Sequence, residues 1–272
     1  MYAERSPVWL AVMLALVLAE AGWRLYSGRG YDFRATLATL GLVLGGVVLA
    51  RLHAVTLTPI FESVSAFAPW QLDIASWESW IVGFFAVEFA YYWFHRASHR
   101  VRWLWASHAV HHSAEEMTLL ASVRLGWTNL LSAGWVVYLP LVLIGFPPAM
   151  VFLLLAFNLR YQFFLHTEAV GRLGPIEWVF NTPAHHRVHH ASNARYLDCN
   201  YGGVLIIFDR WFGSFREECP EEPIIYGLAH RQPSYNPLVI AFREWGLMMR
   251  DAWRAHGVRA RVQKLAGPPA DE

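Results

Sequence analysis

The chain has 272 residues, of which 56% are hydrophobic and 16% charged, and its mean hydropathy is +0.28. A soluble domain has about 45 to 50% apolar and about 25% charged residues, so this chain has more apolar residues than one ordinary core requires. Disordered and collagen-like classes are excluded, and scattered Trp, Pro and Gly exclude a long coiled coil. The net charge of +1 predicts no nucleic-acid partner.

The excess apolar residues form blocks near the N-terminus. Residues 8–23 contain one charged residue, Glu20, residues 35–50 contain none, and residues 80–94 contain only Glu88. A membrane-spanning helix needs about 20 largely apolar residues. We therefore expect membrane helices in these three blocks.

A fourth apolar segment is too long for one span. It comprises the 35 uncharged residues between Arg124 and Arg160, interrupted by Gly145-Phe146-Pro147-Pro148. Proline cannot continue a helix, so residues 126–165 predict a membrane hairpin with its turn at Pro147 and Pro148. The fold class expected is an all-α integral membrane protein with about four to five transmembrane or hairpin helices.

Arginine placement predicts the orientation in the membrane. Basic loops stay on the cytoplasmic side, and no Lys or Arg occurs in residues 52–80. Loop 24–34 and the chain after residue 95, except the hairpin turn, are therefore expected inside. Arginine also greatly outnumbers lysine, and we expect a bacterial inner membrane. Arginines follow the first and third blocks at Arg24, Arg29, Arg34, Arg96, Arg100, Arg102 and Arg124.

The sequence divides into three predicted regions. Residues 1–94 are N-terminal transmembrane helices, residues 95–240 are a catalytic region that includes the hairpin, and residues 241–272 are an amphipathic helix and tail. The polar, Arg-rich chain after Gly171 is expected to form a cytoplasmic helical cap. The C-terminal region alternates arginines with Trp, Leu and Met, which is typical of a helix on an anionic leaflet or of a solvated helix packed on the cap.

Histidine carries the chemical signal, because most of the 13 histidines lie in clusters. Residues three and four apart share a helix face, so each cluster is expected to present its imidazoles in one direction. Topology places the clusters together at the cytoplasmic membrane boundary. His166, at the foot of the hairpin, is a ninth candidate ligand. The three clusters are His95-x3-His99, His108-x2-His111-His112 and His186-x2-His189-His190.

Eight or nine imidazoles exceed what one ion accepts, so two metal ions are expected. Imidazole suits Fe, Zn, Cu and Ni. A nitrogen-rich pair beside the acyl region favours iron and oxygen chemistry on lipid C–H bonds over zinc hydrolysis. A metal-binding or metal-transport protein is the alternative, although its ligands belong near mid-membrane. A bis-histidine haem protein is a third interpretation, but it requires single histidines on facing helices, whereas this sequence has adjacent pairs.

Several runs resemble the fatty acid hydroxylase superfamily, which includes sterol desaturases, over about residues 91–237. Two further runs resemble its alkylglycerol monooxygenase-like members. The chain departs from those members at Arg100 and at Arg124-Leu125-Gly126. The superfamily runs are Tyr92-Trp93-Phe94-His95-Arg96-Ala97-Ser98-His99, Leu104 to Ser113 and Asn181 to His190, and the other two are Tyr161 to Glu168 and Asn200 to Arg210.

The resemblance implies a membrane-embedded di-iron enzyme that hydroxylates or desaturates a lipid with O2 and two electrons. It implies a lipid substrate, a redox partner or reductant, and tetrahydrobiopterin as one possible electron donor. In sterol-desaturase relatives the position matching His185 is not histidine, so His185 is expected to orient its neighbours rather than bind metal.

Polar residues near the third cluster are candidates for orienting the ligands. Asp198, Asn200 and Asp209 are expected either to accept a ring N–H of a ligand histidine or to form turns and helix caps. Arg187 is expected to pair with Asp198 or to bind a lipid headgroup. Glu88 is interpreted as a paired structural carboxylate rather than a catalytic one.

Overall fold

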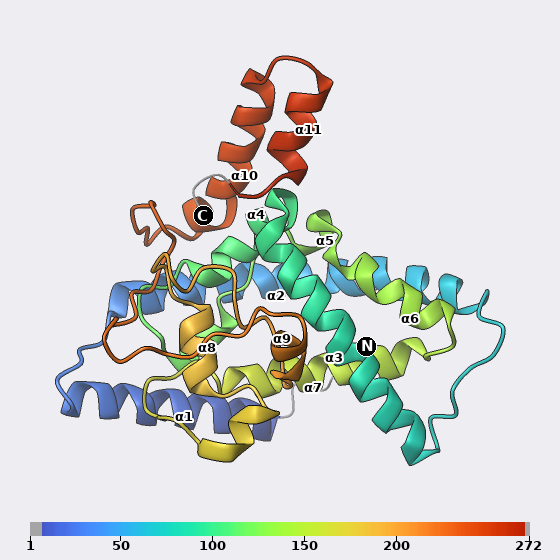
Figure 1. Ribbon diagram of the computed structural model, residues 1–272, viewed down its shortest axis with the longest axis horizontal. Coiled ribbons are helices and arrows are strands. Elements are labelled where there is room, and N and C mark those ends of the chain that lie inside the picture. The colour runs from blue at the N-terminus through green and yellow to red at the C-terminus, as the bar shows by residue number, and fades with distance from the viewer. Residues whose placement is uncertain (1–6, 270–272) are drawn as a thin grey trace.

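The computed structural model describes residues 7–269, and the ends of the two predicted terminal regions lie outside them. The described residues form helices and no strand, only two isolated β-bridges, which confirms the helical class. The helices are α1 Pro7–Tyr26, α2 Phe33–Ser65, α3 Trp77–Arg100, α4 Arg102–His112, η1 Leu119–Val123, α5 Asn129–Ser132, η2 Gly134–Tyr138, α6 Leu139–Leu143, α7 Pro148–Phe163, η3 Gly174–Trp178, α8 Pro183–His189, α9 Ile207–Trp211, α10 Pro237–Arg254 and α11 Val258–Ala266 (Figure 1).

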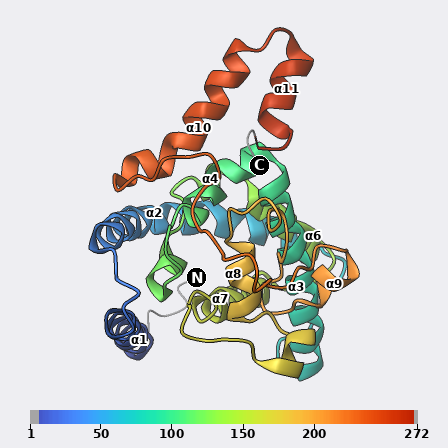
Figure 2. The ribbon, with the colours of Figure 1, turned by 60° about the vertical axis from the view of Figure 1, so that its left-hand side comes forward.

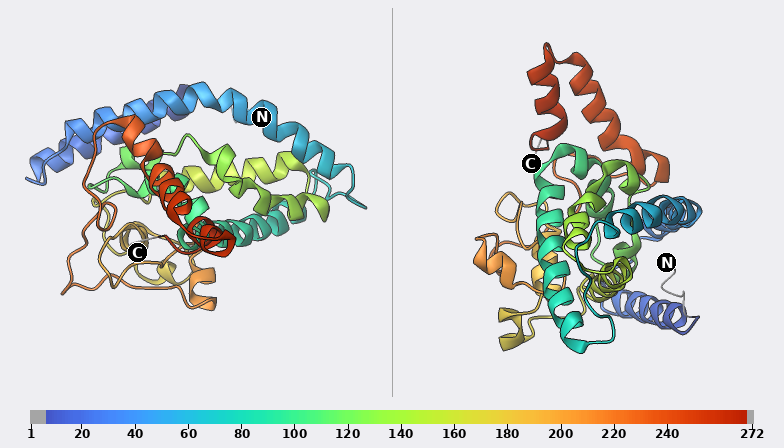
Figure 3. Two further views of the ribbon diagram at one scale, coloured as in Figure 1. Left: turned by 90° about the horizontal axis from the view of Figure 1, so that it is seen from above. Right: turned by 90° about the vertical axis from the view of Figure 1, so that its right-hand side faces the viewer.

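Two helices, α1 and α2, are long and apolar enough to cross a membrane by length and composition. The loop between them ends at Asp32, whose Oδ1 accepts the N–H groups of Arg34 at 2.8 Å and Ala35 at 3.1 Å and so caps α2. Apolar side chains on both helices face outward, with Leu14 59% and Leu44 67% exposed. Figure 3 shows α1 and α2 along one edge of the molecule and the cap segment around α8 along the opposite edge.

The third apolar block forms α3, which continues past the block to Arg100. Its last turns therefore carry His95 and His99. Val101 leaves the helical conformation, with φ −117° and ψ 113°, and α4 begins at the next residue. This break lets α4 fold back against α3, so that two histidine-bearing helices meet.

The predicted hairpin has its turn where the sequence placed it. Gly145 has φ +105°, and α7 starts at Pro148 and forms the returning arm. The first arm, however, is broken into α5, η2 and α6. A left-handed residue, Ala133 with φ 57°, separates α5 from η2, and Phe94 packs so closely on Gly134 that a Cβ there would lie 2.3 Å from its Cε2. The first arm of the hairpin is therefore irregular where Gly134 packs closely against α3.

The C-terminal region forms two helices rather than one. Asn236 caps α10 by accepting the N–H of Leu238 at 2.9 Å, and Gly257, with φ +86°, separates α10 from α11. Helix α10 packs on α4 and α2. The end of the α10–α11 hairpin, where α10 connects to α11, projects beyond the rest of the molecule in two views (Figures 1 and 2).

The largest buried apolar cluster lies among α2, α3, η2, α6 and α7. It includes Phe61, Val87, Tyr138, Val142 and Met150. Burial of such side chains is worth about 1.5 to 3 kcal/mol each. This core fixes the positions of α3 and α7, the two helices that lead into His95 and His166.

Candidate metal centre

Nine buried or half-buried histidines form two groups. Within each group, the candidate ligand atoms all lie within 4.8 Å of one another. These nine are the residues that the sequence pattern predicts as ligands. The five-histidine group is His95, His99, His108, His112 and His189, and the four-histidine group is His111, His166, His186 and His190.

The histidine runs do not each serve one group, in contrast to the expectation that each run points in one direction. On α4, His108 and His112 are four residues apart and share a face, and both join the five-histidine group, while His111 joins the four-histidine group. On α8 the assignment is reversed, because the pair four residues apart, His186 and His190, joins the four-histidine group. Each H-x2-H-H run therefore supplies ligands to both groups.

The ring nitrogens are spaced as ligands of a shared ion would be. In the five-histidine group, Nε2 of His108 lies 3.0 Å from Nε2 of His95 and 3.2 Å from Nε2 of His112. In the four-histidine group, Nε2 of His166 lies 3.1 Å from Nε2 of both His111 and His186. Metal–nitrogen bonds of about 2.0 to 2.1 Å place neighbouring ligand nitrogens about 2.9 to 3.4 Å apart. The donor set fits two imidazole-bound metal ions.

Main-chain carbonyls orient three of the rings. Nδ1 of His95 donates to the Tyr201 carbonyl at 2.7 Å, and Nδ1 of His189 donates to the Cys199 carbonyl at 2.9 Å. Nδ1 of His166 donates to the carbonyl of Gln162, 2.7 Å away. Each bond puts the proton on Nδ1 and leaves the Nε2 lone pair free to bind metal.

Several ring nitrogens in the two groups are buried without a hydrogen-bond partner. They include Nε2 of His99, His189 and His190. A buried nitrogen without a partner costs about 1 to 3 kcal/mol, and a coordinated metal ion removes that cost. These unpartnered atoms support metal binding independently of the spacing.

Burial also keeps the α8 imidazoles neutral. It lowers the pKa of His189 to about 4. It also holds the pKa values of His186 and His190 well below the ordinary imidazole value, and neighbouring imidazoles add to both shifts. Neutral imidazole is the form that binds metal, so these rings are ready to bind at neutral pH.

The polar residues after the third cluster support the carbonyls rather than the rings. Asp209 accepts the N–H groups of Tyr201 at 2.8 Å and Gly202 at 2.7 Å, and the Ser214 hydroxyl at 2.7 Å. Burial raises the pKa of Asp209 to about 6, so at neutral pH it is largely a carboxylate that can accept all three bonds. Asp209 therefore acts on His95 through the Tyr201 peptide.

Asn200 and Asp198 likewise hold this loop instead of a ring. Asn200 Nδ2 donates to the carbonyls of His185 at 3.1 Å and Arg216 at 2.8 Å, and its Oδ1 accepts the Arg216 N–H. Asp198 forms an ion pair with Arg100 at 2.9 Å. The expected contacts with ligand rings are corrected accordingly, because the ring acceptors are backbone carbonyls.

Arg187 does not contact Asp198, one of its two expected partners, and its binding to a lipid headgroup stays a prediction; His185 lies outside both histidine groups. Arg187 pairs with Glu218 at 3.0 Å and not with Asp198. It also donates to the carbonyls of Thr167 and Val170. Nδ1 of His185 is buried and has no hydrogen-bond partner. The His185 ring packs on Phe215, with centroids 5.3 Å apart. His185 belongs to neither histidine group.

Glu88 is a buried structural acceptor. Its carboxylate accepts the amide of Asn158 at 2.5 Å and the N–H groups of Val204 at 2.8 Å and Leu205 at 3.1 Å. These bonds tie α3 to α7 and to the loop after Tyr201. The interpretation of Glu88 as a paired, noncatalytic carboxylate agrees with these contacts.

Two buried charges on α1 also reach the centre, and the sequence pattern did not reveal a role for them. Glu20 accepts the Thr167 hydroxyl and, at 2.6 Å, the Leu119 N–H. Arg24 pairs with Glu168 at 2.7 Å and Glu116 at 3.2 Å. Charges at the end of an apolar block were the available signal, but their partners are distant in sequence.

A cavity of about 450 Å³ adjoins both histidine groups. It reaches His108 of the five-histidine group and His111 and His166 of the four-histidine group. Most of its other lining is apolar or aromatic, and α1, α2, α3, η2 and α7 all contribute to it. Lining residues of this kind include Trp9, Met13, Leu57, Phe94, Trp135, Tyr138, Leu155 and Leu159. The cavity is therefore largely apolar and opens onto candidate ligands of both histidine groups.

Comparisons with known proteins agree with this site. Residues 80–214 match the fatty acid hydroxylase family model. The chain is 35% identical to alkylglycerol monooxygenase from Xenopus tropicalis over 98% of its length and 59% of the relative's, and 40% identical to the Homo sapiens protein over 73% and 43%. Ornithine lipid hydroxylase OlsE from Rhizobium tropici is 28% identical over 76% and 63%.

No solved structure matches significantly. The chain covers less than two thirds of the length of each of these curated relatives. The family match begins at the start of α3 and ends just beyond α9, and it includes all nine histidines of the two groups. The chain therefore contains a fatty acid hydroxylase domain.

Proposed function

We propose that this chain is a membrane-bound di-iron oxygenase that hydroxylates or desaturates the alkyl part of a lipid. The observation that carries the proposal is the apolar cavity of about 450 Å³, because it ends on histidines of both groups. The names of the relatives, alkylglycerol monooxygenase and ornithine lipid hydroxylase, support the same reaction class.

The residues have distinct roles in this proposal. The five-histidine and four-histidine groups would each hold one iron ion. Two bound iron ions would supply the activation of O2 with two external electrons. The apolar cavity wall orients the alkyl chain and excludes water. The Tyr91 hydroxyl donates to Gln162 Oε1 at 3.0 Å on this wall, and we assign no separate acid or base.

We place the centre on the cytoplasmic side of a membrane, and for this chain we propose a bacterial inner membrane. Arg24 pairs with Glu116 and Glu168, which flank His112 and His166 in the chain. Arg29 in the loop that follows α1 also pairs with Glu168, at 3.5 Å, so the loop contacts the segment that carries His166. Because such loops remain cytoplasmic, the centre shares that side.

Metal analysis and lipid analysis test the proposal together. Protein purified after iron-replete expression is expected to contain about two iron ions per chain, as the two ligand groups imply. Lipid extracts from cells with and without the protein are then compared by mass spectrometry. A gain of one oxygen atom identifies hydroxylation, and a loss of two hydrogen atoms identifies desaturation.

The electron donor is tested in the same preparation. Tetrahydrobiopterin and a protein reductant are supplied separately, and product is measured under each condition. Zinc in both groups despite ample iron, with unchanged lipids, would contradict the oxygenase and leave the metal-binding alternative.

A further inference from the structure

Helix α10 carries an apolar stripe that is largely exposed in the described structure, although the ring of Phe242 contacts Trp127 at its edge, with centroids 5.9 Å apart. Leu238, Phe242, Met249 and Trp253 are spaced by four, seven and four residues and thus share one helix face. Their exposed fractions are 60%, 46%, 52% and 85%. An uncovered apolar strip on a helix marks an interaction surface.

The stripe is separate from the face that packs on the protein. Ile240 and Ala241 pack with residues of α2 and α4, and Trp245 and Met248 pack with Ala106 of α4. The apolar surface of α10 is therefore wider than its contact with the rest of the chain. A helix that only packed on the cap would need no apolar residues beyond this buried face.

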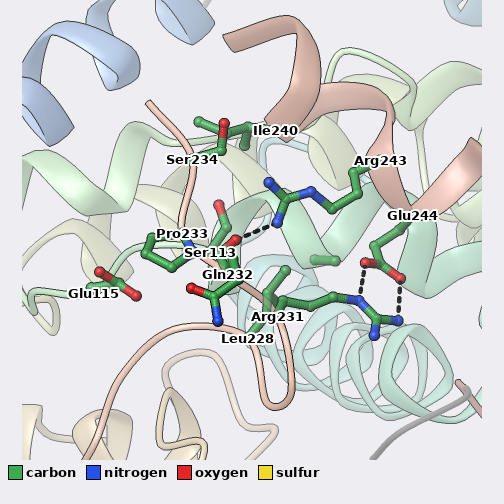
Figure 4. Close-up of a pocket in the computed structure, with 11 residues that line it drawn as sticks. Ser113, Glu115, Leu228, Arg231, Gln232, Pro233, Ser234, Ile240, Arg243 and Glu244 are labelled. Carbon is green, nitrogen blue, oxygen red and sulfur yellow. Dashed lines mark hydrogen bonds and ion pairs between the residues drawn. The ribbon is translucent and has the colours of Figure 1, made fainter. Parts of the chain in front are cut away.

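Charge on the two helices favours an anionic occupant. The helices α10 and α11 contain six basic residues and two acids. Both acids have partners in the body of the protein: Glu244 pairs with Arg231 at 2.9 Å, as Figure 4 shows, and Asp251 pairs with Arg102 at 2.6 Å. Asp251 also pairs with Arg250 at 3.3 Å, so one carboxylate is shared by two arginines and the balance on the two helices stays basic. The basic residues are Arg243, Arg250, Arg254, Arg259, Arg261 and Lys264.

The arginines lie next to the stripe on the helix. At 100° per residue, Arg243, Arg250 and Arg254 fall on one face, between the stripe and the buried face. Helices at membrane interfaces combine an apolar face in the acyl region with basic side chains that reach lipid phosphates. The order of faces on α10 matches this pattern.

The start of α10 lies beside the N-terminal end of α2, one of the two candidate membrane helices. The hydroxyl of Tyr235 donates to Asp32 at 2.8 Å, and the Arg34 guanidinium lies 4.3 Å from the Tyr235 ring centroid. Pro237 packs on Gly41, where a Cβ would lie 2.6 Å from the proline Cγ. The first turn of α10 is thus fixed beside the first turns of α2, next to the Arg-rich loop.

We propose that the α10–α11 hairpin lies in the interface of an anionic membrane leaflet, with the Leu238–Trp253 stripe in lipid and the neighbouring arginines at the phosphates. Figures 1 and 2 show the hairpin extending beyond the helical body. The hairpin enlarges the membrane-bound area of the protein on the side of the α1–α2 loop. The proposal does not depend on the reaction that the histidine centre performs.

Site-specific fluorescence tests the proposal in the full chain in lipid nanodiscs. In a C219S background, W253C is labelled with an environment-sensitive dye, and E217C on the cap, whose side chain is 63% exposed, is the matched control. In discs containing phosphatidylglycerol, quenching by brominated acyl chains is expected to be at least roughly twofold stronger for the label at 253 than for the label at 217. Acrylamide, a quencher in water, is expected to act in the reverse order.

A charge variant tests whether the arginines hold the hairpin on the anionic leaflet. The changes R250E and R254E are expected to reduce quenching by brominated lipid at 253 in anionic discs to the level found in phosphatidylcholine discs. Equal acrylamide quenching at 253 and 217 in both lipids would overturn the proposal. Protection from both quenchers, with cross-linking between copies, would also overturn it and would assign the stripe to self-association.

Discussion

His111 and His112 are neighbours in the chain, yet their rings belong to different histidine groups. Their planes are 86° apart, with centroids separated by 5.7 Å. Successive residues on a helix point about 100° apart, so adjacent imidazoles on α4 diverge. A single short helix can therefore link two metal sites.

This relationship predicts that H111A and H112A affect different metal ions. H111A removes one of four candidate ligands of one group, and H112A removes one of five candidate ligands of the other group. Each variant should retain close to one iron ion per chain under conditions where the parent retains two. Elemental analysis gives the count, and Mössbauer spectroscopy shows which iron environment is lost.

The matched control is H185A, because His185 is buried on α8 but belongs to neither group. It should keep the metal content of the parent. Loss of both ions in H111A and H112A alike, or equal loss in H185A, would contradict independent groups.

The spacing of eight histidines, and the position of His166 at the foot of the hairpin, predicted which residues gather at the centre but not their division between the two groups. In an H-x2-H-H run on a helix, the last two histidines are adjacent and point about 100° apart, so they cannot face the same ion. The runs around His108 and His186 therefore contained this division. It emerged only when α3, α4 and α8 were packed together.

Other features depend on contacts between distant parts of the chain. Apolar blocks predicted α1, α2 and the hairpin turn, because burial in lipid requires long uncharged runs. The broken first arm, by contrast, accompanies the packing of Gly134 on Phe94. The role of Glu20 likewise depends on Leu119 and Thr167, about 100 and 147 residues away, which no local pattern reveals.

Asp209 is expected to stabilise the metal centre through the Tyr201 peptide. Replacing it in D209N removes negative charge that accepts two backbone N–H groups, and the Tyr201 carbonyl then holds His95 less firmly. Residues that orient ligands typically change metal affinity roughly 10- to 100-fold. Competition with a chelator measures the affinity.

D198N is the matched control for D209N. Asp198 pairs with Arg100, whose side chain is 54% exposed, and such a pair contributes little, about 0 to 1 kcal/mol. Asp198 also accepts the Tyr201 hydroxyl at 3.2 Å, but it accepts no N–H of the peptide groups on either side of Tyr201, and an asparagine oxygen can still accept that hydroxyl. Its metal affinity should stay within a few-fold of the parent. Equal weakening in both variants would assign the effect to loop charge rather than to the Tyr201 peptide.

Glu88 is expected to be important for stability rather than chemistry. E88A leaves the Asn158 amide and two backbone N–H groups without their acceptor. The free energy of unfolding should fall by at least about 3 kcal/mol, since three buried donors lose their acceptor and each unpaired donor costs about 1 to 3 kcal/mol. Thermal unfolding in detergent measures the loss.

A matched acid on α2 tests whether burial causes this effect. Glu62 is exposed, so E62A should change the unfolding temperature little. An E88A protein that unfolds at the temperature of the parent but turns over no substrate would show instead that Glu88 acts in the reaction.

The cavity is expected to determine which alkyl chains the enzyme accepts. Leu155 lines the cavity, whereas Leu153 on the same helix does not belong to the lining and is 49% exposed. L155F narrows the cavity away from the histidines, so kcat/KM for a long alkyl chain should fall roughly tenfold, the effect of about 1.4 kcal/mol of overpacking. Shorter chains should lose less, and metal content should not change. A chain-length series measured for L155F, L153F and the parent checks this: equal losses at every length, or the same profile in L153F, would mean that this cavity does not hold the alkyl chain.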